Sequence, residues 1–111
     1  MNITLVKKIK LDGTPCPKSA NVLEDLEKLG LLDCIDEIVA VDEREQLSKG
    51  FILALKHKVE AAPFFIVNND DGSSHVYKAY YRFLKEVFHQ EVSASKEILE
   101  MMDQNLDLDF I

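Results

Sequence analysis

The chain has 111 residues, of which 47% are hydrophobic and 30% charged, and its formal net charge is −7. This length fits one domain, and the acidic surplus disfavours binding to nucleic acid or to an anionic membrane surface. The longest apolar runs, such as "PFFIV", are too short to span a bilayer. The first residues alternate like a strand and lack the pattern of a secretory signal, so we expect a cytoplasmic protein with reduced thiols.

The first part of the chain predicts a strand followed by a helix. Apolar residues alternate through "NITLVKKI" at 2–9, and β-branched residues are mixed in, which is typical of a strand. From about residue 16, apolar residues recur at helical spacing, with Val22 widening the stripe. Gly30 fits the C-terminal cap of this helix.

A second strand and a second helix are predicted next. The apolar run at 36–42 is bounded by acids, as expected for a strand buried on both faces. Apolar residues at four-residue spacing predict a helix over 43–59, in which Gly50 favours a kink or a late start. The predicted buried stripe of this helix is Leu47, Phe51, Leu55 and Val59.

The second half predicts a hairpin and two more helices. "PFFIV" at 63–67 indicates a buried strand, a turn-rich stretch covers 68–74, and 75–80 returns as the next strand. Helical patterns follow at 81–90 and at 93–106. The order β-α-β-α-β-β-α predicts an α/β fold with a four-stranded mixed sheet, helices on both faces and an extra C-terminal helix.

Cys16 lies between two prolines in the turn that leads into the first predicted helix. Pro17 fits the first helical position, where its missing N–H had no partner in any case. Cys16 therefore falls at or beside the N-cap, where unpaired N–H groups and the helix dipole favour a thiolate. Lys18 adds a nearby positive charge, and Ser19 would donate a hydrogen bond to the sulfur. The turn alone leaves two alternatives open: an incidental small residue, which is the more frequent case for a lone cysteine, and a reactive thiol.

A Cys-x-x-Ser turn, "CPKS" at 16–19, precedes the first helix, and a proline opens the third strand in "EAAPFFIV". In this element order the two features resemble the thioredoxin/glutaredoxin-like superfamily. There, a redox cysteine at the first helix faces a cis-proline at the third strand. The resemblance implies a thioredoxin-like domain over 1–91; residues 92–111 lie beyond it and are expected to form a helical extension packed on the same domain. It further implies a cis Ala62–Pro63 bond and a substrate groove lined by Pro17, Ala62 and Pro63.

Ser19 stands at the position of the family's resolving cysteine, so the resemblance implies a monothiol thiol–disulfide oxidoreductase. Cys16 would form a mixed disulfide with a protein disulfide or a glutathionylated protein thiol. Lys18 and Ser19 would tune its thiolate, and an external thiol would resolve the mixed disulfide. No cofactor and no metal is expected, and glutathione is a candidate co-substrate only. The region after the hairpin reads "HVYKAYYRF" in place of the Gly-Gly-acid pattern of glutaredoxins.

Two other functions stay open. The same fold serves as a binding or adaptor module when the groove beside Pro63 holds a protein segment and Cys16 is vestigial. The third hypothesis is an iron–sulfur cluster shared between two chains through Cys16 and glutathione. It ranks last because Pro17 stands where such proteins usually have glycine.

The second cysteine, the histidines and the tail give weaker signals. Cys34 is expected to be buried near the start of the second strand, on the order of 20 Å from Cys16, too far for a disulfide. The three histidines lack metal-ligand spacing. The apolar tail at 98–111 predicts either a helix docked on the sheet or a partner-binding segment.

Overall fold

The computed structural model describes residues 1–60, 62–92, 95–96 and 99. Within these residues the protein is an α/β protein with a four-stranded mixed sheet and three helices. The elements are β1 (Asn2–Ile9), α1 (Pro17–Lys28), the 3-10 turn η1 (Leu32–Cys34), β2 (Glu37–Asp42), α2 (Lys49–His57), β3 (Phe64–Asn68), β4 (Ser74–Tyr77) and α3 (Tyr80–Val87). The chain forms two compact units, Met1–Lys78 and Ala79–Ile111.

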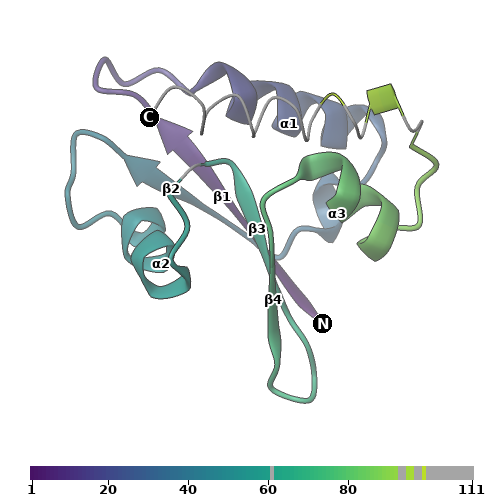
Figure 1. The fold of residues 1–111 in the computed structure, drawn as a ribbon. Coiled ribbons are helices and arrows are strands. Elements are labelled where there is room, and N and C mark those ends of the chain that lie inside the picture. Colours follow the sequence, from purple (N-terminus) through teal and green to yellow (C-terminus); the bar gives the residue numbers. More distant parts are fainter. Residues whose placement is uncertain (61, 93–94, 97–98, 100–111) are drawn as a thin grey trace. The chain divides into compact units, whose positions relative to one another are not determined.

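The sheet lies in the first unit and has the strand order β2-β1-β3-β4 (Figure 1). β1 pairs with β2 in parallel and with β3 antiparallel, while β3 and β4 form an antiparallel hairpin. The parallel pair is joined through α1, as the predicted β-α-β unit requires. The mixed four-stranded sheet expected from the sequence is confirmed, and β1 and β3 are its central strands.

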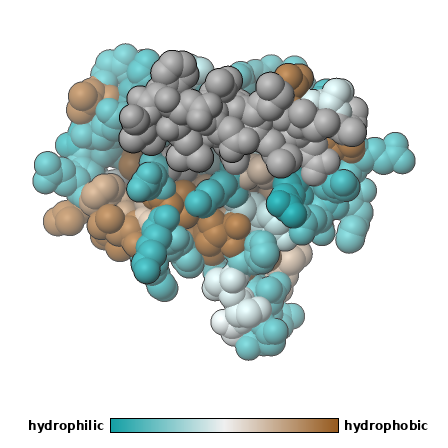
Figure 2. Space-filling view, in the orientation of Figure 1, coloured by the Kyte–Doolittle hydropathy of each residue, from teal (hydrophilic) through white to brown (hydrophobic). Residues whose placement is uncertain are grey.

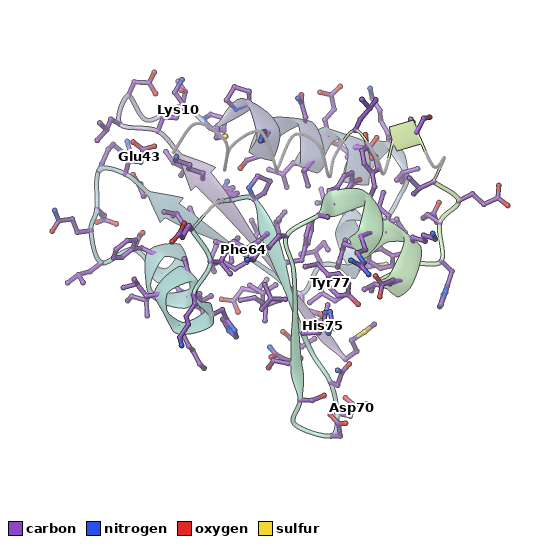
Figure 3. The ribbon with its side chains drawn as sticks, viewed as in Figure 1. Lys10, Glu43, Phe64, Asp70, His75 and Tyr77 are labelled. Carbon is purple, nitrogen blue, oxygen red and sulfur yellow. The ribbon has the colours of Figure 1, made fainter. Side chains whose placement is uncertain are left out.

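The two helices of the first unit lie on opposite sides of this sheet (Figure 1). Val6, Val39 and Phe64 share one face, and Leu53 and Ala54 of α2 pack against their cluster (Figure 3). Because neighbouring strand residues point to opposite faces, Leu5 and Phe65 face the other side, and both are buried. The remaining members of the α2-side cluster are Val59 and Ile66.

β2 is less buried than its sequence predicts. The run at 36–42 predicted burial on both faces, but in the structure only Val39 of β2 is buried. Ile38, on the opposite face, is 42% exposed. The expectation is wrong because β2 is an outer strand of the sheet, with α2 packed on the Val39 side alone. An apolar run does not by itself distinguish a central strand from an edge strand.

α2 begins later than the start of the pattern at 43–59 and turns a different face inward. Ser48 is its N-cap residue, and the Ser48 hydroxyl accepts a hydrogen bond from the backbone N–H of Asp42 at 3.1 Å. Gly50 is buried against β2: a Cβ built there would lie 2.2 Å from the carbonyl carbon of Ala40. With Gly50 facing the sheet, most of the predicted stripe points outward. Leu47 is 82% exposed and Leu55 is 64% exposed.

The second unit contains α3, which ends at Val87 and not at residue 90. Its last turn is followed by Phe88, whose ring meets that of Phe83 edge-on at 5.3 Å. His89 has a left-handed φ of 55°, and the chain turns back there with the Gln90 N–H donating to the Leu84 carbonyl at 3.1 Å. The predicted helix at 93–106 and the apolar tail at 98–111 lie largely outside the described residues.

Candidate functional site

Cys16 is fixed between β1 and α1 through its backbone. It is the N-cap residue of α1, Pro17 follows at the first helical position, and no side-chain capping hydrogen bond is present. The Cys16 N–H donates to the Lys8 carbonyl at 2.9 Å, and the Cys16 carbonyl accepts from Ala20 N–H at 2.9 Å. The predicted N-cap position is therefore confirmed. The side chain is partly exposed and is a free thiol.

The loop before Cys16 folds back along the end of β1. The Gly13 N–H donates to the Lys10 carbonyl at 2.9 Å, and the Lys10 N–H donates to the Thr14 carbonyl at 2.8 Å. Asp12 accepts from the hydroxyl of Thr14 at 2.6 Å and from its N–H at 2.9 Å. These two hydrogen bonds lower the pKa of the Asp12 carboxyl. The loop is thus held in one compact turn that returns the chain to Lys8.

Ser19 lies in the first turn of α1, as predicted, but its hydroxyl makes a different hydrogen bond from the predicted one. Its side chain is 1% exposed, and Oγ accepts a hydrogen bond from the backbone N–H of Lys8 at 3.0 Å. The predicted bond from Ser19 to the Cys16 sulfur is not among the contacts of the described residues. Lys18, between them in the chain, is exposed. Ser19 therefore ties the first turn of α1 to β1, which fixes where Cys16 lies.

A hollow of about 420 Å³ opens beside Cys16 at the carboxyl ends of β1 and β2. Lys8 and Lys10 bring two positive charges to it, and Lys8 Nζ lies 3.2 Å from Glu43 Oε1. Lys10 and Glu43 lie at the same end of the sheet (Figure 3). The other residues that line the hollow are Leu11 and Asp12. The hollow thus carries two lysines and two carboxylates, and the start of α1 is the feature beside Cys16 that favours a thiolate.

Sequence reasoning missed Lys8, Lys10 and Glu43 as neighbours of Cys16. A signal was present, because the two lysines alternate at the end of the first strand and Glu43 directly follows the second. Parallel strands bring their carboxyl ends to one edge of a sheet. Here the Glu43 N–H donates to the Ile9 carbonyl at 3.0 Å. The predicted parallel pairing of β1 and β2 was therefore enough to bring the three residues together.

Pro63 directly precedes β3, and its bond with Ala62 is cis, as the resemblance implied. Phe64 pairs with Val6 in the antiparallel ladder, so Pro63 continues toward the end of β1 at which Lys8 and Cys16 lie. Pro63 is partly buried, and Ala62 packs against the α2-side cluster. Neither residue lines the hollow, nor does the exposed Pro17. The sheet places Cys16 and Pro63 at one end, while the predicted groove between them stays a prediction.

Cys34 differs from its predicted environment. It ends the 3-10 turn η1 and is exposed, so the expectation of a buried thiol at the start of β2 is wrong. The cause is that η1 forms a separate turn between α1 and β2. The 12 residues of α1 separate Cys34 from Cys16, which corresponds to about 18 Å of helix, against about 7 Å for disulfide-bonded Cα atoms. Both thiols are free.

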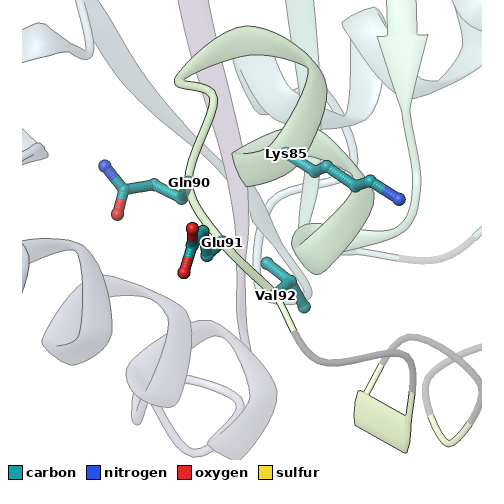
Figure 4. Close-up of a pocket in the computed structure, with 4 residues that line it drawn as sticks. All are labelled: Lys85, Gln90, Glu91 and Val92. Carbon is teal, nitrogen blue, oxygen red and sulfur yellow. The ribbon is translucent and has the colours of Figure 1, made fainter.

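The second unit has a hollow of its own, of about 600 Å³ (Figure 4). Lys85, Gln90, Glu91 and Val92 line it. One cation, one carboxylate and one amide are present, and none of these side chains is a thiol, a hydroxyl or an imidazole. This hollow therefore offers no nucleophile of the kind that Cys16 provides.

In the part of the chain that the structure describes, no three histidine, cysteine, aspartate or glutamate side chains are grouped so that they could hold a metal ion. His75 instead stacks on Tyr77, with ring centroids 4.4 Å apart (Figure 3). None of the helices formed by the described residues is long and apolar enough to cross a membrane.

The site is thus a single cysteine at a helix N-terminus, beside a hollow with two lysines and two carboxylates, at the end of a sheet that also carries a proline. Comparison of the chain with protein-family models, with characterised proteins and with solved structures gives no match. The function is therefore argued from the geometry of this site.

Proposed function

We propose that this protein is a monothiol thiol–disulfide exchange protein of thioredoxin/glutaredoxin-like fold, with Cys16 as the nucleophile. The strand order β2-β1-β3-β4, with a parallel first pair and an antiparallel hairpin, supports this fold. The placement of Cys16 before α1 and of Pro63 before β3 supports it further. A protein disulfide or a glutathionylated protein thiol is the proposed substrate.

The observation that carries the proposal is the position of the Cys16 thiol. It is partly exposed, caps α1 without a side-chain hydrogen bond of its own, and lines a hollow together with two lysines and two carboxylates. Unpaired N–H groups at a helix start stabilise a thiolate, the form that attacks disulfides. A cysteine buried in the core would not be accessible to a disulfide.

The exchange proceeds in two steps. The Cys16 thiolate attacks one sulfur of a disulfide; that S–S bond breaks, a Cys16 mixed disulfide forms, and the other sulfur leaves as a thiolate that takes a proton from water. A small external thiol, of which glutathione is the representative, then attacks the mixed disulfide as its thiolate and releases Cys16. Ser19 has no sulfur to do this, and its hydroxyl is bonded to the Lys8 N–H. Each step exchanges one disulfide for another, so no further oxidant or reductant is consumed.

Thiol alkylation followed by mass spectrometry tests the proposal, with each cysteine serving as the control for the other. In the Cys34→Ser variant, Cys16 is expected to react with iodoacetamide at pH 7 about tenfold faster than Cys34 does in the Cys16→Ser variant. Incubation with a glutathionylated peptide should give a mixed disulfide on Cys16, which added glutathione removes. Equal alkylation rates together with no mixed disulfide would contradict the proposal.

A further inference from the structure

The turn that leads into Cys16 has the same hydrogen bonds as the tip of the β3–β4 hairpin. In both turns a glycine N–H donates to the carbonyl three residues earlier, at 2.9 Å for Gly13 and 3.0 Å for Gly72. The aspartate before each glycine accepts from the hydroxyl and from the N–H of the residue after it, Thr14 in one turn and Ser73 in the other. Gly13 has a φ of 85° and Gly72 a φ of 88°. The chain thus contains two matched turns.

The two turns differ in what lies against the glycine. A Cβ built at Gly13 would lie 2.9 Å from Nη1 of Arg44 and 3.6 Å from its Cζ, so the guanidinium lies against this glycine. A Cβ built at Gly72 would have no atom of the described residues within 4 Å. Arg44 belongs to the loop between β2 and α2, which comes close to the 10–14 turn at this end of the sheet (Figure 1). The loop after β2 therefore supports the turn that leads into Cys16.

Arg44 is itself held in place by Asp42, the last residue of β2. Nε and Nη2 of Arg44 donate to the two carboxylate oxygens of Asp42 at 3.0 and 2.8 Å, and the Arg44 backbone N–H donates to the same carboxylate at 3.0 Å. This two-point contact fixes the plane of the guanidinium, with Nη1 on the side of Gly13. The Arg44 side chain is therefore held in one position, although it is 52% exposed.

Polar contacts join these two loops, because neither loop adds to the core. Residues 11–15 and 43–47 are all exposed, and the surface at this end of the first unit is mostly hydrophilic (Figure 2). The Glu43 N–H donates to the Ile9 carbonyl at 3.0 Å, and the Glu43 carboxylate pairs with Lys8 Nζ at 3.2 Å. The Lys8 carbonyl accepts from the Cys16 N–H. Glu43 thus contacts the base of the turn, and the next residue, Arg44, contacts its glycine.

We propose that Arg44 is a positioning residue for Cys16: held by Asp42, it braces the turn at Gly13 and so keeps Cys16 at the N-cap of α1. This inference rests on the proposed thiol exchange, in which Cys16 attacks as a thiolate favoured by the helix start. Without the brace, the bridge between Ile9 and Pro15 and the bond from the Cys16 N–H to β1 open more often. Arg44 acts through the turn and does not contact the substrate.

Amide hydrogen exchange of the full-length chain, followed by NMR, tests the brace. Gly13→Ala and Gly72→Ala introduce the same backbone strain, because both glycines have a positive φ. Gly13→Ala should in addition displace the guanidinium, since its Cβ would lie 2.9 Å from Nη1. The N–H groups of Lys10 and Asn69 donate across the two turns at 2.8 Å and serve as matched probes.

Gly13→Ala should speed exchange at Lys10 about fivefold more than Gly72→Ala speeds it at Asn69. In the Arg44→Ala background this difference should disappear, because the side chain that the new Cβ meets is gone. Equal effects of the two glycine substitutions in the wild-type background would overturn the inference.

Thiol alkylation in the Cys34→Ser background tests whether the brace acts on Cys16. The ratio of the iodoacetamide rate at pH 7 to that at about pH 9.5 follows the thiolate fraction and cancels changes in access. Arg44→Lys keeps the charge but cannot make the two-point contact with Asp42, so it should lower this ratio about two- to fivefold. Gly72→Ala is the control and should leave the ratio unchanged.

An unchanged ratio in Arg44→Lys would overturn the inference even if the turn exchanged faster, because Arg44 would then support the turn without acting on the thiol. The proposed exchange function has a separate test, the mixed disulfide formed by wild-type Cys16. Amide exchange and the alkylation ratio do not depend on that disulfide, so a failure of the function and a failure of the brace give different results.

Discussion

The Ser19 hydroxyl accepts a hydrogen bond from the backbone N–H of Lys8 at 3.0 Å, joining the first turn of α1 to β1. The carbonyl of the same residue, Lys8, accepts from the Cys16 N–H at 2.9 Å. One residue of the central strand therefore holds both the cysteine and the serine of the Cys-x-x-Ser turn. In this chain the serine has a structural task that does not depend on redox chemistry.

Replacing Ser19 by alanine should destabilise the protein. The variant leaves the partly buried Lys8 N–H without its partner, which is expected to lower the free energy of unfolding by about 1–3 kcal/mol. Urea denaturation followed by circular dichroism measures the change. Ser74→Ala is the control, because the Ser74 hydroxyl is exposed, and its loss should change stability by less than about 0.5 kcal/mol. Equal effects of the two substitutions would contradict the assigned role of Ser19.

Gly50→Ala should also be destabilising, against the usual direction for this substitution in a helix. A Gly-to-Ala change inside a helix ordinarily stabilises by about 0.5–1 kcal/mol. Here the added Cβ would lie 2.4 Å from the Ala40 carbonyl oxygen, and backbone atoms cannot turn aside. We expect a loss of about 1–3 kcal/mol, as for other overpacked sites.

Thermal and urea denaturation of Gly50→Ala and of Lys56→Ala make this comparison. Lys56 is an exposed position of the same helix, so its change tests helix propensity without the clash. A Gly50→Ala variant as stable as the wild type would show that α2 does not lie directly on β2.

Much of the fold follows from local patterns in the sequence. The alternation of apolar residues at 2–9 predicted β1 with its observed bounds. Gly30, predicted as the C-terminal cap, lies two residues after the last residue of α1. What the pattern at 43–59 did not determine is which side of α2 faces inward. That depends on the fit of Gly50 to the backbone of β2, and the four-residue spacing of apolar residues carries no information about it.

Part of the candidate site was also predictable from local sequence. Pro17 at the first helical position determines that Cys16 caps α1, because both facts concern neighbouring residues. The partner of Ser19 and the lysines beside Cys16 depend on how α1 and β2 are arranged around β1. Spacing along one helix favoured a Ser19–Cys16 bond, whereas the structure gives the buried hydroxyl a backbone donor from the strand.

Asp42 should titrate well below an ordinary aspartate. Hydrogen bonds from the Arg44 side chain and from its backbone N–H lower the pKa of Asp42 from 3.8 to about 2. A carboxyl whose pKa is depressed in the folded state contributes stability above its unfolded pKa of 3.8 and loses it as the pH falls through about 2.

Carboxyl NMR detects this titration directly. We expect a midpoint for Asp42 of about 2 in the wild type and a higher one in Arg44→Gln, whose decline in stability below pH 4 should be shallower. Glu43→Gln is the control, since it alters the neighbouring charge and leaves the Asp42–Arg44 contacts in place. A wild-type midpoint at the ordinary value of 3.8 would show that Arg44 does not hold the carboxylate.

Reversing the charge of Lys10 should change how Cys16 discriminates between charged and neutral reagents. Lys10 lines the hollow beside Cys16, so it should attract the anion iodoacetate and leave neutral iodoacetamide unaffected. In Lys10→Glu the ratio of the iodoacetate rate to the iodoacetamide rate is expected to fall about two- to fivefold, since exposed charges interact by up to about 1 kcal/mol in water. The ratio cancels any change in the intrinsic reactivity of the thiol. The control is Lys56→Glu, which changes the net charge of the protein by the same amount at a position away from the hollow and should leave the ratio unchanged. If both variants lowered the ratio equally, Cys16 would be responding only to the overall charge of the protein.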